Sequence, residues 1–471
     1  MRQIRRKRSD IELLYSGRKK QTIVGIFQGQ LPEYFRDINR NNSYFYYLRI
    51  MNNKSYIPRI SDKALIDQLN LSGAVLVEGA KWCGKTQSSI QVAKTVIFLQ
   101  DPDVGPGYLA LADTKPSLLL EGETPLLIDE WQMAPVLWDA VRFAVDRRML
   151  TGQFILTGSV TPPDNHLSHS GTGRIARIRM RPMSLFESGE STGQVSLYNL
   201  FHGETDITCK SELSIENISN AICRGGWPMA IAQKIQNSKV AFNYVDSVIN
   251  TDVQREVGFE KNPESIRMLL QSLARNISTL ATSKTIMDDI AANHSTITDK
   301  TLNIYLNILR RIFVIEDVPA WQPSLRSKTA IRTSNKRQFV DPSIATAVLR
   351  TNSDGLLKDF QTFGLLFESL CTRDLRIYSQ AIDGDIFHYR DKSGLEADLI
   401  IKLHDGKWAA VEVKLGMKQI DDAATNLIKL RNKVDTEKMN PPSFLMVLTG
   451  GQMAYKRKDG VLVVPIGCLK D

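Results

Sequence analysis

The chain has 471 residues, of which 42% are hydrophobic and 24% are charged. This composition is ordinary for a soluble globular protein and excludes collagen-like, low-complexity and wholly disordered chains. No run approaches the ~18 apolar residues of a membrane helix, and the length predicts roughly three domains. The five cysteines show no C-x-x-C spacing, so we expect no disulfide framework, no thiolate zinc site and a cytoplasmic location.

The net charge of +9 is concentrated near the start of the chain. Residues 1–50 hold eleven Lys or Arg and four acidic residues, whereas the other 421 residues carry 49 basic and 47 acidic side chains. A basic arm of this kind is typical of nucleic-acid binding. The competing interpretation is an upstream extension outside the working protein, because Met51 opens a segment that leads directly into the first expected helix.

A phosphate-binding motif follows the first expected helix, for which Ser61 and Asp62 are suitable cap residues. An apolar strand at 74–77 leads into G-x-x-x-x-G-K-T at Gly79–Thr86, and a helix is expected at 87–95. A glycine-rich turn with an incidental lysine is the alternative. The order of strand, loop and helix favours the phosphate loop.

The chemistry of this loop predicts ATP and Mg²⁺ as cofactors. Its glycines let backbone N–H groups surround phosphate oxygens, Lys85 would contact the β- and γ-phosphates, and Thr86 would ligate Mg²⁺. The residues expected to contact the nucleotide here are Gly79, Ala80, Lys81, Trp82, Cys83, Gly84, Lys85, Thr86 and Gln87.

A second apolar strand ends in two carboxylates, Asp129 and Glu130. Asp129 would bind the nucleotide-associated Mg²⁺, through water, and Glu130 would orient or activate the attacking water. Alone, such a pair is a plain strand end, and its occurrence downstream of Lys85 favours catalysis.

The third expected strand ends in small polar residues, and in a parallel sheet its carboxyl end lies beside the phosphate site. Thr157 or Ser159 could therefore contact the γ-phosphate, although an ordinary turn explains them equally well. Arg174, in a glycine-rich loop, is a candidate arginine finger acting in trans. Arg177 and Arg179 are its rivals, and a solvated surface position is the alternative for each.

These motifs together resemble the AAA-like ATP-binding domain of many bacterial and archaeal ATPases. The resemblance implies an α/β fold with a P-loop NTPase domain built on a parallel sheet, and assembly into a homo-oligomer or with a partner protein. The resembling segments are 57–59, 79–86, 129–132, 156–159, 173–174, 182–185 and 225–228.

The middle of the chain is expected to be helical and then to form a winged helix. A helix at 285–293, a turn, a helix capped by Thr298 or Asp299, and a strand at 312–318 follow in the winged-helix order. The second helix presents a thin basic face, so packing between domains competes with DNA contact. That face consists of Lys300, Asn303, Asn307 and Arg310.

The carboxyl-terminal part shows one helix followed by three strands. Strand alternation places Glu412 and Lys414 on one face, with Asp398 on the neighbouring strand of a hairpin. Asp398 and Glu412 would hold a divalent metal, and Lys414 would stabilise or deprotonate a nucleophilic water. The alternative is a sheet with a surface salt bridge.

This segment resembles the restriction-endonuclease-like fold, in which the first helix often contributes an acidic residue that Glu368 matches here. Segments 336–342 and 461–466 also resemble the last part of such ATPases, whose end domain has no settled activity. The expected division is a basic extension (1–50), an AAA-like P-loop ATPase domain (51–190), a helical segment (191–262), a winged-helix-like module (263–322) and a restriction-endonuclease-like domain (323–471).

The sequence therefore predicts an enzyme that hydrolyses ATP with Mg²⁺, coupled to a DNA-related or defence function. DNA would be contacted through the winged helix and the end domain. The alternative is a nucleotide-dependent switch that binds protein partners and carries an inert nuclease-like domain. The residues predicted to be catalytic are Lys85, Glu130, Arg174, Asp398, Glu412 and Lys414.

Overall fold

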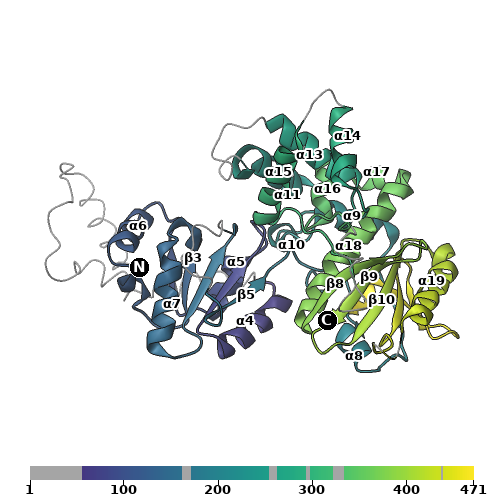
Figure 1. Cartoon of the computed structure of the whole chain (residues 1–471), viewed down its shortest axis with the longest axis horizontal. Helices are drawn as coiled ribbons and strands as arrows, with labels where there is room; N and C mark the ends of the chain where they lie inside the picture. Colours follow the sequence, from purple (N-terminus) through teal and green to yellow (C-terminus); the bar gives the residue numbers. More distant parts are fainter. Residues whose placement is uncertain are drawn as a thin grey trace, which may run out of the picture. The chain divides into compact units, whose positions relative to one another are not determined.

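The computed structural model describes residues 56–161, 171–253, 263–292, 297–321 and 334–471, apart from Thr436 and Lys438. Figure 1 shows these parts as coloured ribbons. The basic stretch 1–50 and Met51 lie outside the described residues, so both interpretations of that stretch stay predictions.

A five-stranded parallel sheet carries the phosphate loop, in the order β2-β3-β4-β1-β5. Three of its strands, β1, β3 and β4, are buried along their whole length, as expected for parallel strands covered on both faces. The predicted parallel sheet is confirmed. Its strands are β1 (Ala74–Glu78), β2 (Thr95–Phe98), β3 (Leu126–Asp129), β4 (Phe154–Gly158) and β5 (Ile175–Arg179).

The helices of this region differ slightly from the predicted bounds. The first helix begins at Ile60 and not after Asp62, because the Asp62 carboxylate accepts a hydrogen bond from the Arg59 N–H at 2.8 Å and closes the first turn. The helix after the loop ends at Val92, since Thr95 already begins β2. These helices are α4 (Ile60–Leu71), α5 (Lys85–Val92), α6 (Gly105–Thr114) and α7 (Val136–Arg148), with short turns η1 (Pro116–Leu120) and η2 (Trp131–Met133).

The middle of the chain is mainly helical, but the prediction of a helical segment from residue 191 is wrong at its start. Two short strands lie there, β6 (Val195–Ser196) and β7 (Thr208–Lys210), and both pair with strands near residue 460. The helices that follow β6 are α8 (Leu197–Phe201), α9 (Ile215–Arg224), α10 (Pro228–Ala232), α11 (Lys239–Ser247), the π-helical turn η4 (Val248–Asp252), α13 (Pro263–Arg275), α14 (Ser283–Ala291), α15 (Asp299–Arg311), α16 (Pro342–Val348) and α17 (Ser353–Lys358).

The two helices expected in the winged helix are found as α14 and α15, whereas the turn predicted between them lies largely outside the described residues. The Thr298 hydroxyl accepts a hydrogen bond from the Thr301 N–H at 3.2 Å, so Thr298 is the cap of α15. The strand predicted at 312–318 is wrong, because Phe313 has a left-handed φ of 57° and only isolated bridges follow. On the polar face, Arg310 donates to the Asp317 carboxylate at 2.9 Å, which weakens an already thin basic surface.

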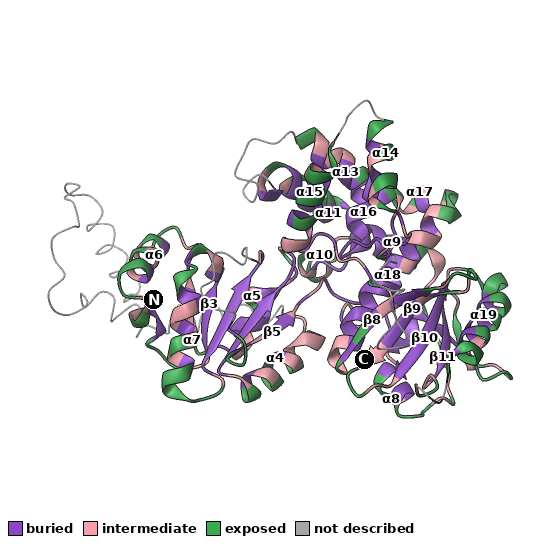
Figure 2. Ribbon diagram, viewed as in Figure 1, coloured by how far each residue is buried: buried purple, intermediate pink, exposed green. Residues whose placement is uncertain are grey.

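A seven-stranded mixed sheet forms the carboxyl-terminal region, in the order β7-β12-β13-β11-β10-β9-β8. The three strands predicted before residue 414 are found, and Trp321 and Trp408 pack together at 4.7 Å between ring centroids in the core. Figure 2 shows these strands buried and the outer face of α19 exposed. The elements are α18 (Phe360–Ala381), β8 (Gly384–Arg390), β9 (Glu396–Leu403), β10 (Trp408–Lys414), η6 (Met417–Gln419), α19 (Ile420–Lys433), β11 (Leu445–Thr449), β12 (Met453–Lys456), β13 (Leu462–Pro465), η7 (Ile466–Cys468) and β14 (Leu469–Lys470).

Candidate active site

The loop Gly79–Thr86 joins β1 to α5 and has a shape that requires its glycines. A Cβ at Gly79 would lie 2.0 Å from the Met180 carbonyl oxygen, so no larger residue fits there. Gly84 caps α5 with a φ of 104°, a conformation that glycine adopts without strain. The loop therefore leads into the N-terminus of α5, where backbone N–H groups form a site suited to binding phosphate.

Lys85 is buried, with 5% of its surface exposed, and its ammonium lies over the loop. The Nζ donates to the carbonyl oxygens of Gly79 and Ala80, both at 2.9 Å. Both acceptors are neutral carbonyl oxygens, and the ammonium also opposes the rise that burial causes in the pKa of the neighbouring Asp129 carboxylate. An anionic ligand in the loop would give this ammonium a directly bonded counter-ion.

Asp129 is completely buried and lies directly beside Thr86. Its carboxylate accepts from the Thr86 hydroxyl at 2.7 Å, the Thr157 hydroxyl at 2.6 Å and the Gln100 side-chain amide at 2.9 Å. Burial raises the pKa of Asp129, and the two hydroxyl donors oppose that rise. The residues predicted to hold Mg²⁺ are thus adjacent, and Thr157 contacts Asp129.

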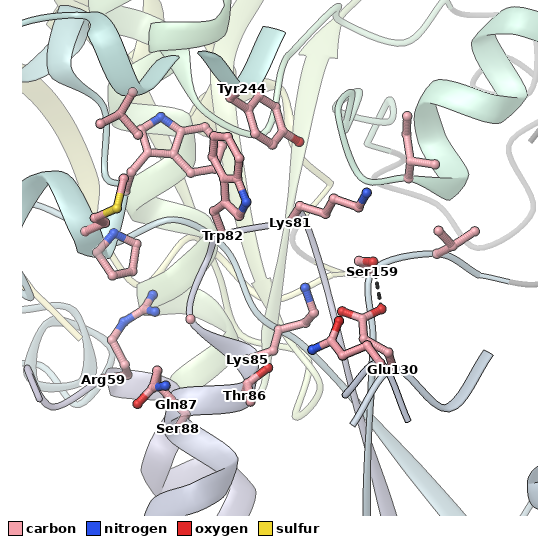
Figure 3. Close-up of a pocket in the computed structure, with 18 of the residues that line it drawn as sticks. Arg59, Lys81, Trp82, Lys85, Thr86, Gln87, Ser88, Glu130, Ser159 and Tyr244 are labelled. Atoms are coloured by element: carbon pink, nitrogen blue, oxygen red, sulfur yellow. Dashed lines mark hydrogen bonds between the residues drawn. The ribbon is translucent and has the colours of Figure 1, made fainter. Parts of the chain in front are cut away.

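Glu130 follows with a left-handed backbone, φ 56° and ψ 48°. Such strain in a residue other than glycine is found preferentially at functional sites. Its carboxylate accepts from the Ser159 hydroxyl at 3.1 Å and from the Gln132 amide, and Figure 3 shows the Ser159 contact. Ser159 therefore contacts the residue predicted to orient water.

Lys85, Thr86, Glu130 and Ser159 border one cavity of about 1120 Å³, which is ample for a nucleoside triphosphate. Figure 3 shows Lys85, Thr86, Glu130 and Ser159 on one side of it, with Lys81, Trp82 and Tyr244 above them. The lining side chains come from the phosphate loop, the start of the described chain, the ends of β3 and β4, and the segment 227–252. Most of the predicted nucleotide contacts border this cavity, and Asp129 contacts it indirectly through Thr86. Three loop residues, Gly79, Ala80 and Cys83, do not line it.

Two contributors to this site were not assigned a role from the sequence. Arg59 is buried, donates to the Cys83 carbonyl of the loop at 2.7 Å and pairs with Glu187 at 2.9 Å, so it fixes the position of the loop. Burial alone would lower the pKa of Arg59, but Glu187 raises it. Gln100, two residues beyond β2, could have been found because a parallel strand ends at this edge.

Arg174 lies far from this edge of the sheet. It immediately precedes β5, and its carbonyl accepts from the N–H of Ala74, the first residue of β1, at 3.1 Å. The phosphate loop follows the other end of β1, so Arg174 does not reach the loop of its own chain. Its side chain pairs with Asp146 at 2.7 Å and is 48% exposed.

Arg177 and Arg179, the other two candidates for an arginine finger, form ion pairs with carboxylates. Arg177 and Arg179 lie 3.4 and 3.2 Å from Glu78 oxygens, and Arg179 also lies 3.6 Å from Glu316. Neither borders the cavity.

A second charged cluster lies between α18, β9 and β10 and contains the residues predicted as a nuclease site. The Lys414 ammonium lies 2.7 Å from Glu412 and 3.3 Å from Asp398. A second ammonium, from Lys336, lies 2.7 Å from Glu368 and 3.4 Å from Asp398. Lys336 belongs to a resembling segment, but its place among the carboxylates was not predicted.

Burial dominates the ionisation of this cluster. It raises the pKa of Glu368 to about 7 and also raises the pKa of Glu412. It would raise that of Asp398 too, but the ammonium groups of Lys336 and Lys414 lower it. Among the described residues, no group of three or more His, Cys, Asp or Glu is arranged to hold a metal ion.

No helix in the parts of the chain that the structure describes combines the length and the apolar character needed to cross a bilayer.

Comparisons with known proteins match three stretches of the chain. An AAA domain matches residues 72–188, and two domains of unknown function, DUF8612 and DUF4143, match residues 215–355 and 363–469. The uncharacterized proteins Rv2008c of Mycobacterium tuberculosis and Mb2031c of Mycobacterium bovis are each 22% identical over 352 residues, which is 74% of this chain and 71% of theirs.

Among solved structures, the Walker-type ATPase PABY2304 of Pyrococcus abyssi is similar at 12% identity with a TM-score of 0.40, over 63% of this chain and 97% of that one. The AAA domain match covers β1, the phosphate loop, β3 and β4. It supports nucleotide binding and ATPase activity for residues 72–188, which are similar to AAA-type ATPases.

Proposed function

We propose that the chain binds ATP in the Gly79–Thr86 loop and hydrolyses it. The observation that carries this proposal is the Thr86–Asp129 contact of 2.7 Å, because it joins the end of β3 to a phosphate-loop residue that borders the cavity. Lys85 and Glu130 border the same cavity. The carboxylate end of β3 and the glycine-rich phosphate loop therefore belong to a single site.

The hydroxyl of Thr86 and the carboxylate of Asp129 are hard oxygen donors, which fit Mg²⁺. They would hold the ion, which when bound neutralises negative charge on the phosphates. Lys85 moves its hydrogen bonds from the loop carbonyls to the β- and γ-phosphates. Glu130 orients a water molecule for attack on the γ-phosphorus and accepts a proton from it. As the water oxygen bonds to phosphorus, the bond from phosphorus to the ADP oxygen breaks.

The test is Lys85→Ala, with Lys94→Ala as the control because Lys94 is an exposed lysine just beyond α5. Loss of the loop ammonium is expected to reduce ATP turnover by about 100-fold or more. Lys94→Ala should hydrolyse ATP like the wild type. Turnover and fluorescent-nucleotide binding are measured on folded protein, verified by circular dichroism. Wild-type turnover in Lys85→Ala would remove this site from the mechanism.

For the carboxyl-terminal region, the cluster favours a nucleotide-dependent switch with an inert nuclease-like domain over an ATP-driven nuclease. Lys336 and Lys414 both contact Asp398, so the charge that a metal would balance is already balanced by ammonium groups. The ion pair between Arg310 of α15 and Asp317 also favours the switch, because it reduces the positive charge that α15 can offer to DNA phosphates. Partner proteins are then the expected targets of the switch.

A cleavage assay distinguishes the two functions. Wild type and Asp398→Ala are incubated with linear, supercoiled and single-stranded DNA in Mg²⁺ or Mn²⁺, with and without ATP. The switch predicts no metal-dependent difference between the two proteins. Cleavage by the wild type that disappears in Asp398→Ala would establish the nuclease instead.

A further inference from the structure

The phosphate loop is attached to the helical middle through two consecutive side chains, Lys81 and Trp82. The Lys81 ammonium pairs with the Asp252 carboxylate at the end of η4. The Trp82 ring packs edge-on against Tyr244 of α11, with centroids 5.7 Å apart. Figure 3 shows Lys81, Trp82 and Tyr244 on the same side of the cavity.

Both contacts fall on one face of the α11–η4 segment. Tyr244 of α11 and Asp252 of η4 both border the cavity, so the two side chains face the phosphate loop from the same side of this segment. Tyr244 is itself anchored on Trp227, with ring centroids 4.4 Å apart. The turn that carries Asp252 is π-helical, a form that occurs frequently at functional sites.

The two members of the ion pair differ in exposure. The Lys81 side chain is 34% exposed and the Asp252 side chain 7%, and both border the cavity. A nucleoside triphosphate in the loop would bring several negative charges close to this lysine, and they would compete with Asp252 for the ammonium. Asp252 would also repel them across the cavity.

We propose that Asp252 is a positioning residue that holds Lys81 away from the phosphates in the nucleotide-free protein. ATP binding transfers the Lys81 ammonium from Asp252 to the triphosphate. This inference rests on the proposed binding of ATP in the Gly79–Thr86 loop and adds to it the element that responds to the nucleotide.

The transfer has a structural consequence. A buried carboxylate that loses its partner is strongly unfavourable, so Asp252 must gain solvent or a new donor. Either change moves η4 and loosens the Trp82–Tyr244 contact. The α11–η4 segment is therefore the part of the helical middle that senses whether the loop is filled.

The experiment measures ATP affinity in a double-mutant cycle made of Asp252→Asn, Lys81→Met and the combined variant. Asp252→Asn keeps the size of the side chain, removes the competing charge, and should tighten ATP binding by ~5-fold or more. The gain should be absent when Lys81 is Met. Asp246→Asn is the matched control, because Asp246 is an exposed acid in α11 outside the cavity, and its affinity should equal that of the wild type.

A second measurement follows the helix itself. Hydrogen exchange of backbone amides in 244–252 should accelerate when the wild type binds ATP, and it should already be fast in nucleotide-free Asp252→Asn. A purely structural role for Asp252 predicts faster exchange without tighter ATP binding.

Unchanged or weaker affinity in Asp252→Asn, or a gain that persists with Lys81→Met, would overturn the inference. Lys85→Ala separates this failure from failure of the proposed function. If Lys85→Ala loses ATP binding while Asp252→Asn has no effect, only the inference fails. If Lys85→Ala binds ATP normally, the proposed function fails first.

Discussion

The phosphate loop and the Lys336–Lys414 cluster both gather charged side chains beside buried strands, but they balance charge in opposite ways. In the loop, the Lys85 ammonium contacts neutral carbonyls and faces a cavity of about 1120 Å³. In the cluster, each ammonium contacts two carboxylates between 2.7 and 3.4 Å away. A lysine held only by carbonyls is ready for an anion, whereas a lysine shared by two carboxylates already has its counter-ions.

The sharpest test of the loop half of this comparison is Glu130→Gln. The amide keeps the shape but cannot accept a proton, so kcat should fall by about 10²–10⁴-fold while ATP affinity stays within about twofold of the wild type. Glu121→Gln, at an exposed acid of the same region, should behave like the wild type in steady-state ATPase assays. Equal losses of kcat and of binding would assign Glu130 to the fold of the loop.

The cluster half predicts a large stability effect with no effect on ATP. Lys336→Ala leaves Glu368 and Asp398 without their shared counter-ion, and the free energy of unfolding should drop by about 3–5 kcal/mol. Lys392→Ala, at an exposed turn, serves as control in chemical denaturation. A fully stable Lys336→Ala that gains Mn²⁺ binding would show that the lysine occupies a metal site.

The same cluster predicts a pH dependence. Burial raises the pKa of Glu368 from 4.5 to about 7, so the folded state binds an extra proton between these values. Its stability contribution is therefore complete below pH 4.5 and is lost as the pH rises to 7, a decrease of about 3 kcal/mol.

Glu368→Gln should reduce the slope of denaturation midpoints measured between pH 4.5 and 8, and the raised pKa of Glu412 supplies part of the slope that remains. Glu396→Gln, at an exposed glutamate of β9, should keep the slope. An unchanged slope in Glu368→Gln would mean that another group takes up the proton.

The smallest expected effect is that of Arg174→Ala. Its pair with Asp146 is solvent-exposed and contributes at most about 1 kcal/mol. Arg174 lies beside the first residue of β1, whereas the loop follows the last residue of that strand. In dilute protein, ATP turnover should stay within about twofold of the wild type. A rate per molecule that rises with protein concentration, and fails to rise in Arg174→Ala, would support a finger acting in trans.

Sequence patterns were sufficient for the parts of the structure that depend on neighbouring residues. Apolar runs predicted the strands around the loop, and the strand predicted at 74–77 lies within β1. Parallel order then placed the ends of β1, β3 and β4 together. The prediction of a strand at 312–318 was wrong because the left-handed backbone of Phe313 cannot be recognised from a run of apolar side chains.

Partners that come from distant segments could not be predicted. Lys336 reaches Asp398 across 62 residues, and Lys81 reaches Asp252 across 171. A single sequence shows which residues carry charge, but the counter-ion of each depends on the packing of the whole fold. The counter-ion of a charged residue decides whether that residue can bind a ligand. The strands that form each site could therefore be predicted, but the ion pairs within it could not.

The pairing of β6 and β7 with late strands affects how the protein is made. The Ser196 hydroxyl donates to the Asp471 carbonyl, 275 residues further along the chain. At typical synthesis rates of 5–20 residues per second, the ribosome needs roughly 15 to 55 s to supply the partner. During that interval, the edge of β7 has no β12 to pair with. Nascent chains stalled before residue 450 should therefore bind chaperones more strongly than the complete chain does. Proteases should cut these stalled chains within residues 195–210.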